Sequence, residues 1–222
     1  MTWHASVLYG QATPRLQACL AADPILGPEL HHIRELPHRF PRRSLQHDLP
    51  AGGLLAVPDV LPPDDRHRAI VPWDALFAAT GPALRFSPPA LLKERGLDPH
   101  AWPPPPALRY LKDLAQRSGA PLSFYRCEMW GGDVEFEAAW IPGWAPGEPD
   151  RVIFHLGEPG RVATAIGSRV TLEEGDPLRR TLEFHRLRLP SPYFAPHTRA
   201  FDWERVDNGI FVFAEESEER PL

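Results

Sequence analysis

The sequence has few cysteines and no long apolar run. Its 222 residues include two cysteines, Cys19 and Cys127, so it lacks the closely spaced cysteines of a secreted disulfide scaffold. No apolar segment approaches the roughly 20 residues that cross a bilayer. Residues 1–10 lack the charged and apolar regions of a signal peptide. These absences predict a cytoplasmic protein that does not bind membranes.

Catalytic and ligand-binding motifs are also missing. The sequence contains no G-x-S-x-G element, no glycine-rich phosphate loop, and no HExxH or CxxC metal motif. The adjacent pair His31 and His32 would point to different sides of a helix, so the two rings would not share an ion. We therefore expect no cofactor, no metal site and no catalytic residue.

The charge balance is mildly acidic, with a formal net charge of -5. Such a protein has no electrostatic reason to bind phosphate backbones, so nucleic acid is not the expected partner. Two segments differ in charge from the chain as a whole: residues 31–47 are locally basic, and the tail at 214–222 is acidic. Both are expected to be solvated segments.

Proline is the most over-represented residue, with 28 of 222 positions against an average of about 5%. Proline ends helices and is excluded from central strands, so we expect short elements and stiff loops. Two proline-rich segments are 37–72 and 103–106. The second is either a ligand for a proline-binding groove or a stiff entry into the next helix, and we favour the helix entry.

Periodicity of apolar residues predicts helices in the first half of the chain and strands in the second. The predicted helices lie at 13–20, 26–36, 72–81, 87–96 and 106–118. The predicted strands lie at 6–9, 54–57, 122–130, 133–141, 151–157, 161–166, 181–188 and 209–213.

This order predicts one α+β domain over residues 1–222. It would divide into a helix- and loop-rich part, a strand-rich part and the acidic tail, at 1–119, 120–213 and 214–222. We expect an antiparallel sheet, mostly from the C-terminal half, with helices from the N-terminal half packed on one face.

A pair of glycines, Gly131 and Gly132, separates two runs of alternating polarity. Such a pair is typical of a two-residue hairpin turn. With that turn, the predicted register pairs Trp130 with Asp133, Glu128 with Glu135, and Arg126 with Glu137. One face is then apolar, and the other carries every charge of the hairpin together with two aromatic residues. The members of this polar face are Phe124, Arg126, Glu128, Trp130, Asp133, Glu135 and Glu137.

Three interpretations of this polar face remain open. It is a solvated sheet surface, or a partner-binding surface formed by Arg126, Glu128, Trp130, Asp133, Glu135 and Glu137. The third is a hydrolase site, because Glu128 and Glu135 would have Cβ atoms about 5 Å apart, suitable for acid and base roles or for a divalent ion. A scaffold protein with no defined site is a further alternative.

A leucine-rich helix, a short break, an aromatic strand ending in Trp-Gly-Gly-Asp and a second acidic strand occupy residues 106–141. This arrangement resembles small bacterial immunity proteins, which protect a cell from a toxin. The resemblance implies a non-catalytic cytoplasmic inhibitor with a protein partner. The polar face of the hairpin would then dock on a basic toxin domain, such as one that acts on nucleic acid.

Overall fold

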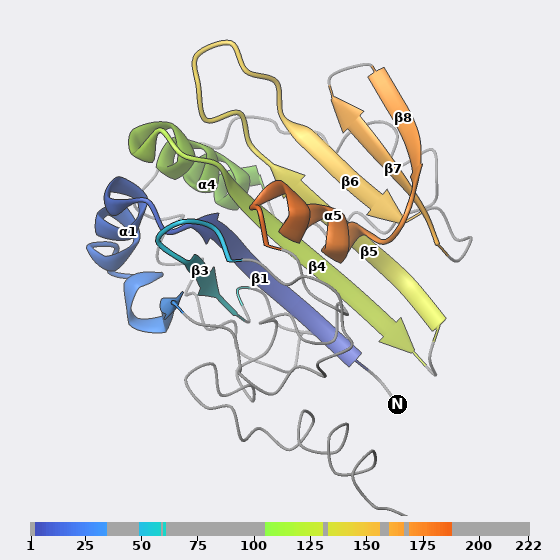
Figure 1. The fold of residues 1–222 in the computed structure, drawn as a ribbon, viewed down its shortest axis with the longest axis horizontal. Coiled ribbons are helices and arrows are strands. Elements are labelled where there is room, and N and C mark those ends of the chain that lie inside the picture. The colour runs from blue at the N-terminus through green and yellow to red at the C-terminus, as the bar shows by residue number, and fades with distance from the viewer. Residues whose placement is uncertain are drawn as a thin grey trace, which may run out of the picture.

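The computed structural model describes residues 3–34, 49–58, 60, 105–130, 133–155, 160–166 and 169–187. Within these residues eight strands form one antiparallel sheet, in the order β2-β3-β1-β4-β5-β6-β7-β8 (Figure 1). The α+β class predicted from the sequence is confirmed. The elements are β1 (Trp3–Gln11), α1 (Pro14–Ala21), η1 (Gly27–Glu29), β2 (His31–Ile33), β3 (Leu54–Val57), α4 (Pro105–Ser118), β4 (Leu122–Trp130), β5 (Asp133–Ile141), β6 (Arg151–His155), β7 (Arg161–Ile166), β8 (Arg169–Glu174) and α5 (Pro177–Phe184).

Two helices begin and end where local chemistry predicts. The Thr13 hydroxyl accepts a hydrogen bond from the Leu16 amide at 3.2 Å, and Pro14 occupies the first turn of α1. Helix α4 starts within the run of prolines, as the interpretation of 103–106 as a helix entry requires. It ends before Gly119, whose φ of +62° is a left-handed conformation that favours glycine.

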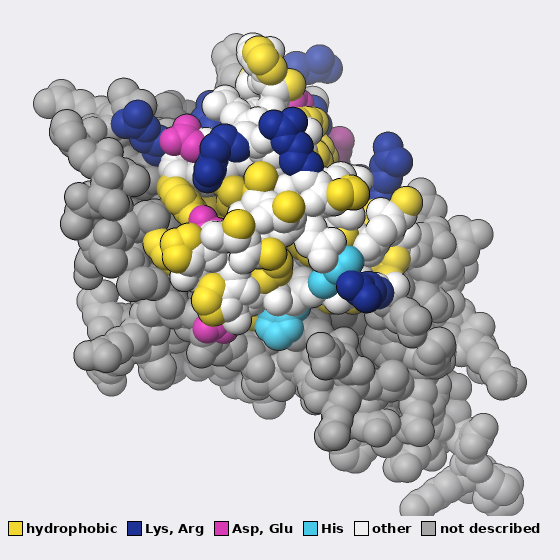
Figure 2. Space-filling model, turned by 90° about the vertical axis from the view of Figure 1, so that its left-hand side faces the viewer, with side chains coloured by type: hydrophobic (Ala, Val, Ile, Leu, Met, Phe, Trp, Pro, Cys, Tyr) yellow, Lys and Arg dark blue, Asp and Glu magenta, His cyan; other side chains and the backbone are white. Residues whose placement is uncertain are grey.

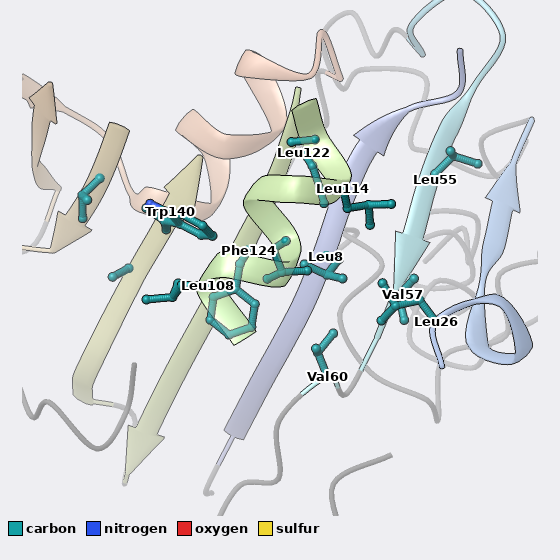
Figure 3. Close-up of a cluster of buried hydrophobic side chains, with 14 of the residues drawn as sticks. Leu8, Leu26, Leu55, Val57, Val60, Leu108, Leu114, Leu122, Phe124 and Trp140 are labelled. Atoms are coloured by element: carbon teal, nitrogen blue, oxygen red, sulfur yellow. The ribbon is translucent and has the colours of Figure 1, made fainter. Parts of the chain in front are cut away.

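Helices α1 and α4 cover one face of the sheet. Four apolar side chains of α4 are buried at helical spacing: Leu108, Leu111, Leu114 and Ala115. Figure 3 shows Leu108 and Leu114 above Leu8 and Phe124 of the central strands, with Trp140 of β5 beside them. This cluster is the larger of the two hydrophobic cores in the described residues.

The other face of the sheet is covered by α5, where the sequence predicted a strand at 181–188. That prediction is wrong. Asp176 caps the helix by accepting a hydrogen bond from the Arg179 amide at 2.8 Å, and Pro177 follows it. Leu178 and Leu182 pack against the sheet in the second core. The central strands are therefore buried on both faces, whereas the sequence predicted helices on one face.

The predicted helix at 26–36 is also wrong. Asp23 accepts hydrogen bonds from the amides of Ile25 and Leu26, at 3.0 and 2.9 Å, and this turn leads into η1. The chain then forms β2, which pairs with β3. Strand β8 was not predicted, because only two of its residues are apolar and its side chains are mostly exposed.

Strands at 54–57, 122–130, 133–141 and 161–166 have the predicted bounds, and β1 is longer than predicted. The predicted helices at 72–81 and 87–96, the strand at 209–213 and the tail at 214–222 lie outside the described residues, as does most of the segment 37–72. Across the described ranges, no helix is both long and apolar enough to span a membrane.

We expect Leu114→Ala to lower the free energy of unfolding by about 2–5 kcal/mol, because the truncation leaves a cavity under α4. The matched control is Asp113→Ala, at the neighbouring exposed position, which should change stability by less than about 0.5 kcal/mol. Urea unfolding followed by circular dichroism measures both. Equal effects of the two variants would contradict the packing of α4 on the sheet.

Candidate functional site

The register of the β4–β5 hairpin starts as predicted and then changes. Trp130 pairs with Asp133, and Met129 with Val134. Beyond these pairs Glu128 lies opposite Phe136, so Glu135 is an extra residue on β5. This bulge moves the rest of β5 by one position, and the predicted pairs of Glu128 with Glu135 and of Arg126 with Glu137 are wrong.

The bulge divides the predicted polar face between the two sides of the sheet. Directly opposed residues of an antiparallel pair point to the same face. Glu137 lies opposite Cys127 and faces α5, whereas Arg126 lies opposite Ala138 and faces α4. Because Glu128 and Glu135 are not opposed, the pairing that suggested a two-carboxylate hydrolase is not formed.

The predicted site residues differ in exposure. Arg126 is 7% exposed and donates to the half-buried carboxylate of Glu128, with 2.9 Å between Nε and Oε1. Asp133, at the outer end of the hairpin, is exposed. The side chains of Trp130 and Glu135 lie outside the described set. Arg126 and Glu128 are therefore hydrogen-bonded to each other, and Glu137 lies apart from them on the other side of the sheet.

Glu137 is buried, with 6% of its surface exposed, and it joins β5 to α5. Its carboxylate accepts hydrogen bonds from the Tyr125 hydroxyl at 3.0 Å and from the Leu178 amide, in the first turn of α5, at 3.2 Å. The pKa of Glu137 is raised to about 7, first by burial and then by the negative charge of Asp176, although both hydrogen bonds lower it. A carboxyl group at a helix N-terminus is also favoured by the helix dipole.

A second buried polar pair holds the other end of α5. The Ser123 hydroxyl and His185 Nε2 share a hydrogen bond of 2.7 Å, and both residues are fully buried. Burial lowers the pKa of His185 to about 3, so its ring is neutral near pH 7. Ser123 and Tyr125 lie on the same face of β4, so this strand contributes to polar contacts at both ends of α5.

The reactive groups of this region are enclosed by the fold. Cys127 is 1% exposed. Burial, and then the charge of Glu137, raise the pKa of its thiol well above the ordinary value. The pair of Ser123 and His185 is equally enclosed. In this arrangement these groups orient α5 on the sheet and do not contact solvent.

The described residues contain no group of three or more His, Cys, Asp or Glu side chains that is arranged to hold a metal ion. Sequence reasoning missed the polar contacts of α5, although one signal was present. Asp176-Pro177 is the same kind of helix start as Thr13-Pro14.

Comparison with models of protein families, with curated proteins and with solved structures finds no match to this chain. The resemblance of residues 106–141 to immunity proteins stays a prediction, and a functional proposal must start from the geometry of the chain.

Glu137 should make stability depend on pH. A carboxyl whose pKa is higher in the folded than in the unfolded protein stabilises the fold below the unfolded value, and this contribution is lost as pH rises through the folded value. For Glu137 the window runs from 4.5 to about 7. We expect the unfolding free energy of the wild type, relative to Glu137→Gln, to fall by up to about 3 kcal/mol across it. Urea unfolding at a series of pH values measures this difference, and a difference independent of pH would contradict the assignment.

Cys127 should resist thiol reagents in the folded protein. In a Cys19→Ser variant, which leaves Cys127 as the single thiol, we expect labelling with a maleimide only after denaturation, because the native thiol is buried and protonated. The matched variant Cys127→Ser retains the partly exposed Cys19, which should react in the native state. Mass spectrometry measures both, and rapid native labelling of Cys127 would show that the face under α5 opens.

Proposed function

We propose that this protein is a cytoplasmic, non-catalytic binding protein of the immunity type, which docks on a cognate bacterial toxin through the outer end of the β4–β5 hairpin. The position of the outer end of the β4–β5 hairpin is the observation that supports this proposal most. In Figure 1 the hairpin extends beyond α4 and α5, so its last residues are not covered by these helices. The contact residues we propose are Glu128, Trp130, Asp133 and Glu135.

This set is smaller than the one predicted from sequence. Glu137 is buried beneath α5 and is no longer proposed as a contact residue. Arg126 is also buried, and its role is to hold the Glu128 carboxylate through their hydrogen bonds. A position fixed in this way costs less conformational entropy on binding, because the side chain is already ordered.

Electrostatics favours a basic partner. The outer end of the hairpin combines acidic residues with one tryptophan, and Trp is enriched among residues that dominate binding energy. Carboxylates presented together attract a basic cleft and increase the rate of association. The side of the molecule that faces left in Figure 1 differs: among the described residues, Figure 2 shows acidic side chains there singly, some beside Lys and Arg side chains and others among hydrophobic ones. A toxin domain that acts on nucleic acid has a cleft of the complementary charge.

The proposal is tested by capturing the partner with the tagged full chain from the native organism. We expect one stoichiometric basic protein that arrests growth when expressed alone in a heterologous host and does not when this chain is co-expressed. Asp133→Lys should weaken the purified complex by at least about tenfold, because it places a cation against a basic surface.

The matched control is Asp113→Lys, an identical charge change at an exposed position on α4. It should leave the affinity within about twofold of the wild type. A captured partner that is equally weakened by both variants would reject the hairpin as the docking surface. A partner without toxicity, or a toxin that this chain does not neutralise, would reject the immunity function itself.

A further inference from the structure

Strand β8 is the outermost strand at one end of the sheet, and it has the properties of an unprotected edge. Within the described residues it pairs with β7 alone, through six consecutive pairs without a bulge. The strand contains no proline, and its charged residues are Arg169, Glu173 and Glu174. The backbone groups along its outer side are therefore arranged to accept another strand.

The exposed apolar side chains of the described residues gather on this strand. Val170 is 37% exposed and Leu172 is 55% exposed. Leu172 lies opposite Ala163 and Val170 lies opposite Ala165, and both alanines belong to the core beneath α1 and α4. Both exposed side chains therefore point to the α4 side of the sheet, beyond the last buried positions of β7.

Three of the remaining side chains point to the other side, whereas Glu174 shares the side of Val170 and Leu172. Arg169, Thr171 and Glu173 alternate with the apolar pair. Glu173 lies on the α5 side, since its Oε2 is 3.5 Å from Arg180 Nε. From Arg169 to Glu173 the order is cation, apolar, threonine, apolar, anion, and this order is complementary to itself when the strand is reversed.

We propose that β8 pairs in antiparallel orientation with β8 of a second copy of this chain, in a register centred on Thr171. Arg169 then lies opposite Glu173 of the second copy on the α5 side, and Val170 lies opposite Leu172 on the α4 side. Each pair occurs twice, because a two-fold axis relates the copies. The sheets of the two copies become one continuous sheet.

Other registers match less well. In an interface with a two-fold axis perpendicular to the sheet, opposed residues must share a face, so the axis must pass midway between the two copies of one residue of the strand. A centre at Leu172 places Val170 against Glu174, and a centre at Glu173 opposes two identical carboxylates. A centre at Val170 leaves Leu172 without an apolar partner. Thr171 is the centre at which charges and apolar side chains both match.

The rest of the described structure leaves room for this pairing. Helix α5 packs mainly against β5 and β6, and its described contacts with β8 are made by Arg180, which lies near Glu173 and donates to the Glu174 carbonyl at 2.7 Å. The Glu173 carboxylate contacts Arg180 through Oε2, and its other oxygen is available to Arg169 of the second copy. The proposed toxin-docking end belongs to β4 and β5, and β6 and β7 separate these strands from β8.

A charge-swap experiment tests the proposal, with sedimentation velocity of the full chain over a concentration series. We expect the wild type to form a dimer, and Arg169→Glu and Glu173→Lys each to raise the dissociation constant at least about tenfold, since each homodimer opposes like charges twice. An equimolar mixture of the two variants should recover association, because the mixed dimer has complementary charges at both pairs. Arg117→Glu, the same charge change in the last turn of α4, should leave the dimer unchanged.

Circular dichroism of each variant checks that the fold is retained. A dimer that is insensitive to both variants, or a mixture that does not recover, would place the interface elsewhere and overturn the proposal. A wild-type monomer would also overturn it, and hydrogen exchange then distinguishes the reason. Protected β8 amides would mean that another segment of the same chain occupies the edge, and unprotected amides would leave the edge to a different protein.

Discussion

The hydrogen bonds to the Glu137 carboxylate connect helix α5 to the sheet. Tyr125 donates from the neighbouring strand and Leu178 donates from the first turn of α5, so one buried acid determines where the helix begins on the sheet. A buried carboxylate is costly without such donors. The bulge at Glu135 makes the contact possible, because without it Glu137 would point to the α4 side.

This constraint explains why the reactive side chains are internal. Ser123, Tyr125, Cys127 and Glu137 share one face of the hairpin, and α5 covers that face. Their hydrogen bonds position the helix, and their pKa values reflect burial. The surfaces proposed for binding lie at the periphery of the sheet instead. One is the outer end of the central hairpin, and the other is the edge strand β8.

Patterns in short stretches of the sequence were sufficient to predict much of the fold. The Thr13-Pro14 start predicted α1, leucine spacing predicted α4, and the pair of glycines predicted the closing pair of the hairpin. The same logic would have found α5 from Asp176-Pro177, but the residues that follow also alternate, and the segment was interpreted as a strand. Without α5 the prediction has helices on one face of the sheet alone, whereas the structure has a core on each face.

The sequence by itself determined the α+β class, the central strands and the acidic character of the hairpin end, because these depend on periodicity and turn residues along a short stretch of chain. Only the tertiary structure decided which side of the sheet each charge occupies. A one-residue bulge reverses the direction of every later side chain, and its position depends on contacts between Tyr125, Glu137 and a helix about 40 residues further along the chain. No local pattern encodes such a contact.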